Sequence, residues 1–297
     1  MGHKKVSIII LTWNKLDFTK KCLAFLEKNT NYSNWEATIV DNGSKDGTRG
    51  FIEEFIKEKG NKYNLILNST NKGYAAGVNQ GIRAAEGDYI LLLNNDVYVL
   101  KNWLISMVET LEKDEKNAIV GAKLIYPTTG RIQHAGVVFL RKIESLHLYK
   151  NSPPDQPRVN KYRYFDAVTG ACMLIRKTIF KEIGFFDERF RFGGFEDIDF
   201  CLRCRIRGYK IIYSPTSISL HDESVSSSQI ENYYKIFKQN YKLFLNKWGP
   251  LFRRYNDPTL LISFKLKMYL IYGIFKFIPN KFVVSIKKWL TTFLSVQ

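Results

Sequence analysis

A regular alternation of strand and helix patterns in the N-terminal third constrains the fold of this chain most. The first pattern, Val6–Leu11, is a run of mainly β-branched apolar residues, typical of a strand buried on both faces. Further strand patterns follow at Ala37–Val40, Leu65–Leu67 and Tyr89–Leu93, and helical patterns separate them at Asp17–Lys28, Thr48–Lys59 and Gly73–Ala85. This order predicts an α/β fold with a mostly parallel, doubly wound sheet and helices on both faces.

The middle of the chain has a less regular pattern. Residues Glu144–Lys161 contain three prolines and no clear period, which predicts a surface loop, and the Ser-rich segment Ser214–Ser228 is expected to be mobile. The remaining expected helices are Trp103–Leu111, Asp197–Arg207 and Ile230–Lys247, and the remaining expected strands are Ala118–Ala122, Val137–Leu140, Ala171–Ile175 and Tyr209–Tyr213.

The positive charge of the chain is unevenly distributed. The chain carries 45 Lys and Arg against 28 Asp and Glu, a formal net charge of +17. Residues 229–297 hold 12 of the basic residues and 2 of the acids, a net +10, so residues 1–228 carry the remaining +7. We therefore predict an α/β domain over residues 1–228 and a basic, aromatic-rich helical appendage over residues 229–297.

The basic C-terminal appendage favours an anionic partner. Lys265–Leu294 mixes Lys with Tyr, Phe, Ile, Leu and Trp, and Pro279 interrupts it. Both halves are too short and too charged to span a bilayer, but they suit two helices lying on an anionic membrane surface. The alternative is that these helices pack on the α/β domain or in a homodimer interface.

Three features predict the compartment. We expect no secretory leader, because the apolar run Val6–Leu11 is short, and the sequence has no apolar stretch of about 18 residues or more. Its four cysteines form no metal-binding set, and Cys201 and Cys204 share one face of a helical pattern. We expect a cytoplasmic protein that is peripheral on the inner face of the cell membrane.

Polar clusters follow three of the predicted strands. Asp41–Thr48 supplies a carboxylate and a glycine turn, and Asn71–Asn79 opens a helix with small residues that let a diphosphate approach the backbone. Asn94–Asp96 ends a strand in amides and an acid, which suits a divalent cation. Because ligands bind beyond the carboxyl ends of parallel strands, we expect the three clusters that directly follow strands to converge, namely Thr12–Asn14, Asp41–Ser44 and Asn94–Asp96. Taken singly, each also fits a turn, a helix cap or close helix–sheet packing.

The segment Phe192–Arg203 contains two adjacent acids after a glycine turn. Glu196 and Asp197 begin an amphipathic helix, whose dipole favours carboxylates there. Crowded carboxylates can differ in pKa, which suits a general base. Asp199 and Arg203 stand four residues apart, and we expect them to form an ordinary ion pair along the helix.

His221 is a candidate metal ligand that follows a predicted strand. A lone histidine is usually an ordinary polar residue, but a cation bound only by Asp96 and phosphate would need a further ligand. His134 and His147 have no comparable sequence context.

The motifs taken in order resemble the family-2 glycosyltransferases, which have the GT-A fold, and within them the bacterial rhamnosyltransferase- and galactofuranosyltransferase-like branch. The resemblance covers about residues 5–225. Several motifs in the right order are far more specific than any one of them. The matching segments are Ser7–Asn14, Asp41–Thr48, Asn71–Gly81, Asp88–Asp96, Thr169–Arg176 and Gly184–Arg203.

The resemblance also implies roles for individual residues. The acidic metal motif of the family falls on Asn94–Asp96, where Asn94 replaces the first acid and Asp96 becomes the metal-contacting one. Asp197 falls on the catalytic base, with Glu196 beside it, and His221 matches a histidine that some relatives place on the metal. The implied nucleotide-sugar-binding residues are Thr12, Asn14, Asp41, Asn71, Gly73, Ala75, Asn79, Asn94 and Asn95.

The family further implies a single-displacement transfer that inverts the anomeric carbon and uses Mg²⁺ or Mn²⁺. We expect a UDP- or dTDP-sugar as donor and a saccharide hydroxyl as acceptor, with a lipid-linked saccharide favoured. The expected setting is the synthesis of a bacterial surface polysaccharide.

Two other functions remain open from the sequence. A non-catalytic protein that binds a polyanion on a degenerate transferase fold would explain the charge of +17, although we find no nucleic-acid-binding motif. A sugar nucleotidyltransferase would need a basic glycine-rich loop after the first strand, and Thr12-Trp13-Asn14-Lys15 is not such a loop.

Overall fold

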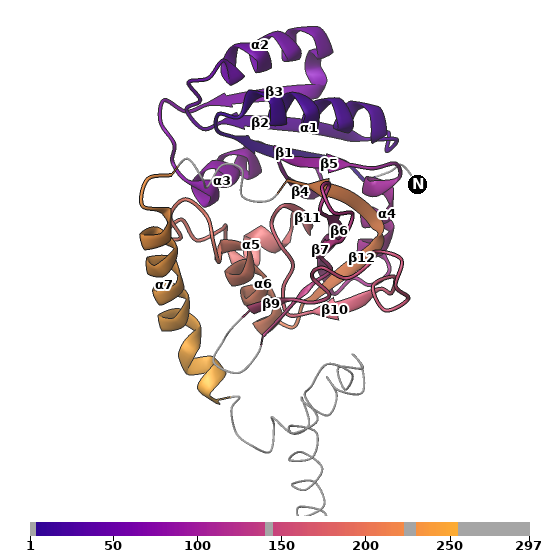
Figure 1. Ribbon diagram of the computed structural model, residues 1–297, viewed down its shortest axis with the longest axis vertical. Coiled ribbons are helices and arrows are strands. Elements are labelled where there is room, and N and C mark those ends of the chain that lie inside the picture. The colour runs from indigo at the N-terminus through magenta and orange to yellow at the C-terminus, as the bar shows by residue number, and fades with distance from the viewer. Residues whose placement is uncertain (1–3, 140–144, 223–229, 255–297) are drawn as a thin grey trace, which may run out of the picture. The chain divides into compact units, whose positions relative to one another are not determined.

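Figure 1 shows the computed structural model, which describes residues 4–139, 145–222 and 230–254. These residues form a ten-stranded mixed sheet with the order β10-β12-β6-β11-β4-β1-β2-β3, in which β5 also pairs with β12 and β7 with β6. A two-stranded sheet pairs β8 with β9. The predicted α/β fold is confirmed.

The N-terminal third forms the parallel half of the sheet, as the alternation predicted. Each predicted element overlaps an observed one, and the differences are confined to the ends, where helices and strands are least sharply defined. The strands are β1 (Val6–Thr12), β2 (Trp35–Asp41), β3 (Tyr63–Leu67) and β4 (Tyr89–Asn94), and the helices are α1 (Leu16–Asn29), α2 (Thr48–Lys59), the short 3₁₀ helix η1 (Gly60–Lys62) and α3 (Tyr74–Ala84).

Strand β1 is buried on both faces. Ile8 points into the hydrophobic cluster that includes residues of α1 and α4, whereas Ile9 and Leu11 point to the opposite face and meet α3. Gly77 and Gly81 of α3 allow this close packing, because a Cβ at either position would overlap the side chains of Leu11 and Ile9. The helices therefore cover both faces of the parallel half, as expected for a doubly wound sheet.

The second half of the sheet mixes strand directions because β11 inserts antiparallel between β4 and β6. Strand β12 then pairs parallel with β6 and extends from Lys210 to His221. The prediction of a mobile segment from Ser214 is therefore wrong up to His221, and residues 223–229 lie outside the described residues. The elements are β5 (Val97–Val99), α4 (Trp103–Glu112), β6 (Asn117–Ile125), β7 (Ile132–His134), β8 (Val137–Phe139), β9 (Ser145–His147), β10 (Arg163–Phe165), β11 (Cys172–Arg176), α5 (Ile179–Ile183), α6 (Glu196–Ile206) and β12.

The segment predicted as a surface loop, Glu144–Lys161, also contains the short strand β9, which pairs with β8. The described remainder consists of turns and bends. The three prolines interrupt regular structure after β9, but they do not prevent a strand before them.

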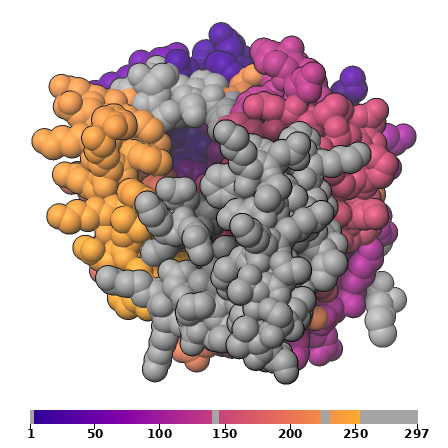
Figure 2. Space-filling model, turned by 60° about the horizontal axis from the view of Figure 1, so that its bottom comes forward, coloured from indigo at the N-terminus to yellow at the C-terminus, as the bar shows by residue number. Residues whose placement is uncertain are grey.

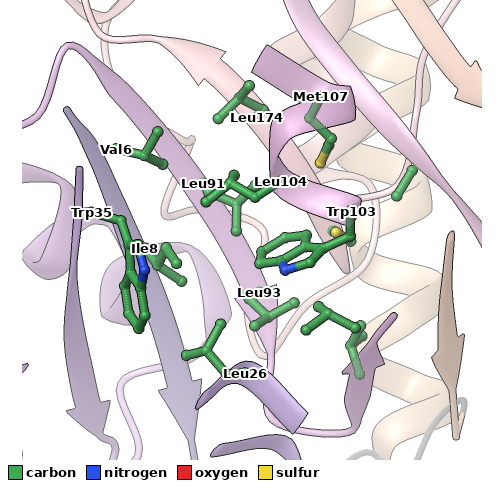
Figure 3. Close-up of a cluster of buried hydrophobic side chains, with 14 of the residues drawn as sticks. Val6, Ile8, Leu26, Trp35, Leu91, Leu93, Trp103, Leu104, Met107 and Leu174 are labelled. Carbon is green, nitrogen blue, oxygen red and sulfur yellow. The ribbon is translucent and has the colours of Figure 1, made fainter. Parts of the chain in front are cut away.

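The core lies between the sheet and the helices α1 and α4 (Figure 3). Trp103 is fully buried among Leu91, Leu93 and Leu104, and its indole N–H donates to Thr30 Oγ1 at 3.1 Å. All four cysteines are buried and free, as expected for structural thiols. This core fixes β1 and β4, whose carboxyl ends carry the polar clusters.

The chain divides into two compact units, residues 1–246 and 247–297. Helix α7 (Tyr233–Arg254) begins in the first unit and contains Pro250. The division after residue 228, which rests on charge, stays a prediction, and Lys265–Leu294 lies outside the described residues. Within the part of the chain that is described, no helix is both long and apolar enough to cross a membrane.

Candidate active site

A cavity of about 360 Å³ opens at the carboxyl ends of β1, β2 and β4. Figure 2 shows a recess beside α7, drawn in orange, with residues from the indigo and purple part of the chain at its floor. The three polar clusters therefore converge on one cavity, as expected for parallel strands. Its lining residues are Leu11, Trp13, Asn42, Asn71, Gly73, Tyr74, Asn94, Asn95, Asp96, His147, Thr169, Ala171, Phe192, Gly194, His221, Ile230 and Tyr233.

The side chain of Asn42 connects the loops after β2 and β3 through four hydrogen bonds. Its amide group donates to Asn71 Oδ1 at 2.9 Å and to the carbonyl oxygen of Gly73 at 3.3 Å. Its Oδ1 accepts from Asn68 Nδ2 and from the backbone N–H of Lys72, both at 3.1 Å. The side chain is buried, so these bonds satisfy it within the protein. The sequence patterns predicted a role for Asp41 but not for its neighbour Asn42.

Asp41 and Asn14 join the loops that follow β1 and β2. Both carboxylate oxygens of Asp41 accept from the backbone N–H of Ser44 at 3.3 Å, and Asp41 is almost fully buried. Asn14 Oδ1 accepts from the backbone N–H of Lys45 at 2.8 Å. Neither predicted donor-binding residue is among those that line the cavity: Asp41 ends β2, and Asn14 lies in the loop after β1.

Thr12 supports Asn95 from behind. The Asn95 amide group donates to the hydroxyl oxygens of Thr12 and Thr19 at 3.2 and 3.1 Å. Those two hydroxyls are themselves 2.8 Å apart. Asn94 and Asn95 line the cavity, whereas Thr12 is buried beneath them.

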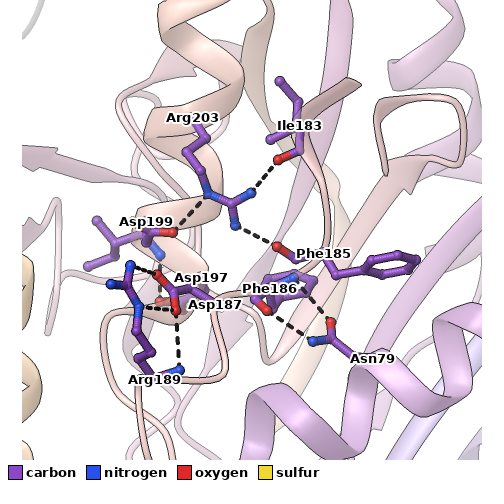
Figure 4. A network of polar contacts seen from close by, with 10 residues as sticks. Asn79, Ile183, Phe185, Phe186, Asp187, Arg189, Asp197, Asp199 and Arg203 are labelled. Carbon is purple, nitrogen blue, oxygen red and sulfur yellow. Dashed lines mark hydrogen bonds and ion pairs between the residues drawn. The ribbon is translucent and has the colours of Figure 1, made fainter. Parts of the chain in front are cut away.

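Helix α3 presents its N-terminus to the cavity. Gly73 has a φ of +88°, and a Cβ there would approach the backbone nitrogen of Phe192 to 3.0 Å, so the position favours glycine. Ala75 is buried in the first turn of the helix. Asn79, two turns into α3, is fully buried and bonds to both backbone polar groups of Phe186, so its amide ties α3 to the segment before α6 (Figure 4).

Asp96 and His221 meet although 124 other residues separate them in sequence. Strand β5 pairs antiparallel with the end of β12, which places His221 opposite Val97. His221 Nε2 consequently lies 3.2 Å from Asp96 Oδ1. Both side chains are buried and both line the cavity.

The Asp96–His221 pair fits a divalent cation. Asp96 Oδ1 is buried and accepts no hydrogen bond, so a lone pair is available there. The described residues hold no cluster of three or more His, Cys, Asp or Glu side chains that could bind a metal alone. A cation at this pair would therefore need oxygen ligands from a bound phosphate or water, which Mg²⁺ and Mn²⁺ accept readily.

Glu196 and Asp197 begin α6 behind the wall of the cavity. Asp197 Oδ2 accepts from the backbone N–H of Gly170 at 2.8 Å, between the lining residues Thr169 and Ala171. Burial raises the pKa of Asp197, against the opposing effect of that hydrogen bond. Burial, together with the charge of Asp197, raises the pKa of Glu196 to about 8. Glu196 Oε2 is buried and has no hydrogen-bond partner.

An ion pair anchors α6 below these acids. Arg203 Nε donates to Asp199 Oδ2 at 2.9 Å, as the four-residue spacing predicted. Its other two nitrogens donate to the carbonyl oxygens of Ile183 and Phe185 at 2.7 and 2.8 Å (Figure 4). Arg203 thus links α6 to α5, which fixes the direction of the helix N-terminus.

A pair of histidines near Asp197 was not predicted from the sequence. His134 and His147 approach with their Nδ1 atoms 3.1 Å apart, and His147 lines the cavity. His134 Nε2 accepts from the backbone N–H of Gly136 at 3.3 Å. Burial lowers the pKa of His134 well below its usual range, and His147 opposes ionisation of His134 further. The pairing of β8 with β9 sets His147 opposite Val137, three residues after His134, and no local sequence pattern predicts this pair.

Helix α7 closes one side of the cavity. Tyr233 lines it, and Asn240 donates to the carbonyl oxygens of Arg191 and Gly193 at 2.9 and 3.1 Å. The ring of Phe244 stacks on Phe195, the residue before Glu196, at 5.3 Å. The start of α7 therefore belongs structurally to the α/β domain and supports the turn that leads into α6.

The comparison with known proteins agrees with this arrangement. The sequence profile of the family described as "Glycosyl transferase family 2" matches residues 7–184. The chain belongs to glycosyl transferase family 2. The resemblance drawn from the motifs is thereby confirmed at the level of the family, while the narrower likeness to rhamnosyl- and galactofuranosyltransferases stays a prediction.

The fold is similar to that of a solved glycosyltransferase structure. The crystal structure of GalNAc-T7 with UDP, GalNAc and Mn²⁺ matches 73% of this chain and 44% of its own, with a TM-score of 0.61 and 18% identity. This similarity confirms the GT-A-type fold.

Two relatives of known sequence are similar over nearly the whole chain. One is O-antigen biosynthesis protein RfbC of Myxococcus xanthus, 30% identical over 88% of this chain and 21% of its own length. The other is uncharacterized protein y4gI of Sinorhizobium fredii, 33% identical over 97% of this chain and 31% of its own. The chain therefore spans less than a third of the length of these relatives.

The family profile ends before the acids of α6. It covers the polar clusters of the parallel half and strand β11, but not Glu196, Asp197, His221 or α7. The roles of these later residues consequently rest on their geometry.

Proposed function

We propose that this chain is an inverting hexosyltransferase that moves a sugar from a UDP- or dTDP-sugar to an acceptor hydroxyl. The observations that carry the proposal are the Asp96–His221 pair, which lines the cavity, and Asp197 at the start of α6, which the backbone N–H of Gly170 holds behind the cavity wall. The first can hold a cation on a departing diphosphate, and the second can take a proton from the attacking hydroxyl.

Asp96 and His221 would hold the divalent cation, Mn²⁺ or Mg²⁺. Such an ion neutralises the charge that develops on a departing diphosphate. Support comes from the unpartnered Asp96 Oδ1 and from the solved relative of the same fold, whose structure contains Mn²⁺ with UDP.

The donor would bind over the loops of the parallel half. Asn71, Asn94 and Asn95 line the cavity, and the N-terminus of α3 at Gly73 can face a diphosphate. Asp41 is proposed to bind the nucleobase, with Thr12 and Asn14 beside it. Ala75 leaves room for the donor, and Asn79 holds α3 against the segment before α6.

Asp197 is proposed as the general base. The backbone N–H of Gly170 fixes its carboxylate, and its raised pKa brings it closer to the range in which a base works well. A single displacement with one base would invert the anomeric carbon, since the hydroxyl attacks opposite the diphosphate. Glu196 would stay protonated and donate a hydrogen bond, because burial raises its pKa to about 8.

The proposed setting is the synthesis of a bacterial surface polysaccharide at the cytoplasmic face of the cell membrane, with a lipid-linked saccharide as acceptor. One support is the similarity to a protein named for O-antigen biosynthesis. A second is the exposed face of α7, where Lys235, Lys238 and Lys242 recur at helical spacing beside the exposed rings of Tyr234 and Phe237.

Vesicle flotation with anionic and neutral lipids tests the membrane part. Replacing Lys235, Lys238 and Lys242 by Gln should weaken binding to anionic vesicles only. Equal binding of the variant and the unchanged chain would contradict a membrane role for this face of α7.

The catalytic proposal is tested by offering a panel of nucleotide sugars with an acceptor saccharide, with and without Mn²⁺. Metal-dependent release of nucleoside diphosphate, with transfer to the acceptor, would support it, and product anomers read by NMR would establish inversion. Release of pyrophosphate from a nucleoside triphosphate and a sugar phosphate would identify a nucleotidyltransferase instead. Absence of turnover together with tight polyanion binding would favour the non-catalytic alternative.

A further inference from the structure

Gln133 makes two contacts with His221 from the far side of the imidazole ring. It lies on β7 and is only 3% exposed. Its Oε1 lies 2.6 Å from His221 Nδ1, and its Nε2 donates to the carbonyl oxygen of His221 at 3.3 Å. The sequence does not predict that these two residues are in contact, since 87 residues lie between them.

The contact with the carbonyl oxygen of His221 determines which atom is the donor in the contact with Nδ1. A carbonyl oxygen can only accept a hydrogen bond, so the NH₂ end of Gln133 must face the backbone of His221. The amide oxygen therefore faces Nδ1, and Nδ1 must carry the ring proton to donate to it. A neutral imidazole with its proton on Nδ1 has a lone pair on Nε2.

That lone pair faces another acceptor. His221 Nε2 lies 3.2 Å from Asp96 Oδ1, which has no hydrogen-bond partner. Two acceptors held this close in a buried site repel one another unless a proton or a metal cation lies between them. With Nδ1 held as the donor to Gln133, Nε2 is the ring nitrogen that remains to bind a cation shared with Asp96.

We propose that Gln133 is a positioning residue that holds His221 in its Nδ1–H form, with Nε2 directed to a divalent cation shared with Asp96. The inference rests on the proposed function of that pair. A neutral amide suits the position better than a carboxylate, because it both accepts from Nδ1 and donates to the backbone and adds no buried charge.

Two variants separate the contributions of Gln133. Gln133→Leu keeps much of the volume but removes both hydrogen bonds, and Gln133→Glu keeps an acceptor for Nδ1 but loses the backbone donor. Outer-sphere partners of metal-binding histidines typically change metal affinity by ~10–100-fold. We expect Gln133→Leu to weaken Mn²⁺ binding in the presence of UDP by that order, and Gln133→Glu to weaken it less.

Two readouts that do not depend on turnover test the inference. Long-range ¹H–¹⁵N NMR of the metal-free protein reports which ring nitrogen of His221 is protonated, and calorimetry with Mn²⁺ and UDP reports affinity. The expected result is Nδ1–H in the unchanged protein and loss of that preference in Gln133→Leu. An unchanged tautomer and unchanged affinity in Gln133→Leu would overturn the inference.

A double-variant cycle with His221→Ala tests whether Gln133 affects Mn²⁺ affinity through His221. In a His221→Ala background, Gln133→Leu should cost no further Mn²⁺ affinity, because the group that it positions is absent. An equal loss in both backgrounds would show that Gln133 acts elsewhere and would overturn the inference. If Mn²⁺ binding in the presence of UDP is independent of both Asp96 and His221, the proposed metal site itself fails, whatever the tautomer measurement shows.

Discussion

The two sides of the cavity differ in how their polar groups are satisfied. On the side built from the end of β1 and the loops after β2 and β3, the amide of Asn42 is bonded to neighbouring protein groups, and the amide of Asn95, from the turn after β4, is bonded to Thr12 and Thr19. On the side where the turn after β4 meets the end of β12, and at the start of α6, Asp96 Oδ1 and Glu196 Oε2 are buried without hydrogen-bond partners.

This difference indicates that one side recognises the donor and that the other holds the groups that take part in the reaction. A network whose members bond to one another is rigid before any ligand arrives, which suits recognition of a donor. Buried acceptors without partners cost free energy and favour the arrival of a cation, a proton or a hydroxyl. Substitutions on the second side should therefore change chemistry, whereas those on the first should change stability and donor affinity.

The largest effect is expected for Asp197→Asn. Asparagine keeps the shape of the side chain and can still accept from Gly170, but it cannot take a proton from the acceptor. General-base loss typically lowers the rate by ~10²–10⁴-fold. Initial rates at saturating donor and Mn²⁺ should fall by this order, while donor affinity measured by calorimetry stays unchanged.

Glu196→Gln is the matched control, because the two acids are adjacent and differ in role. A smaller fall in rate is expected, since a neutral amide can still donate a hydrogen bond. Should Glu196→Gln prove the inactive variant and Asp197→Asn the active one, the assignment of the base would be reversed.

A somewhat smaller effect is expected for Asp96→Ala, on metal-dependent donor binding. Removal of a direct ligand should cost more than the ~10–100-fold typical of outer-sphere changes. UDP titrations with and without Mn²⁺ measure it. His221→Ala should behave alike but milder, and excess Mn²⁺ should partly restore its turnover. Unchanged nucleotide affinity of Asp96→Ala in Mn²⁺ would contradict the metal assignment.

The parallel half could be predicted from sequence because its information is local. Each strand pattern ends in its own polar cluster, and parallel pairing brings consecutive strand ends to one edge without further knowledge. The positions of Asn71, Asn94 and Asp96 at the cavity follow from this rule.

The other side could be predicted only in part, because long-range pairing builds it. Pairing of β5 with β12 brings His221 to Asp96, and pairing of β8 with β9 brings His147 to His134. The serine-rich end of β12 was misjudged because residues of low strand propensity are held there by β6 and β5. Gln133 has no sequence signal at all.

On the donor side, Asn42→Ala should lower stability and weaken donor binding without lowering turnover at saturating donor. It removes four hydrogen bonds and leaves buried partners such as Asn71 and Asn68 less well satisfied. Unsatisfied buried groups cost about 1–3 kcal/mol each, partly offset by rearrangement. Urea unfolding and donor KM measure the two effects. Asn68→Ala is the control, since it keeps the bonds from Asn42 to Asn71 and Gly73. Equal loss of donor affinity in both variants would contradict the proposal that the hydrogen bonds of Asn42 hold the donor loops in place.

The last prediction concerns the pH dependence of stability rather than the rate, and tests whether Glu196 is protonated in the folded chain. Burial raises its pKa to about 8, whereas the carboxyl group of an unfolded chain titrates near about 4.3. Between these values the folded protein holds a proton that the unfolded chain has lost, so Glu196 lowers stability as pH rises and has no further effect above about 8. Glu196→Gln removes this titration while keeping the shape. In metal-free protein, urea unfolding from about pH 5 to pH 8 should therefore show the variant gaining stability relative to the unchanged chain as pH rises. If the stability of the two proteins changes with pH in parallel, Glu196 is ionised throughout. The contrast between a donor side with hydrogen-bonded polar groups and a reacting side with unpartnered ones would then rest on Asp96 alone.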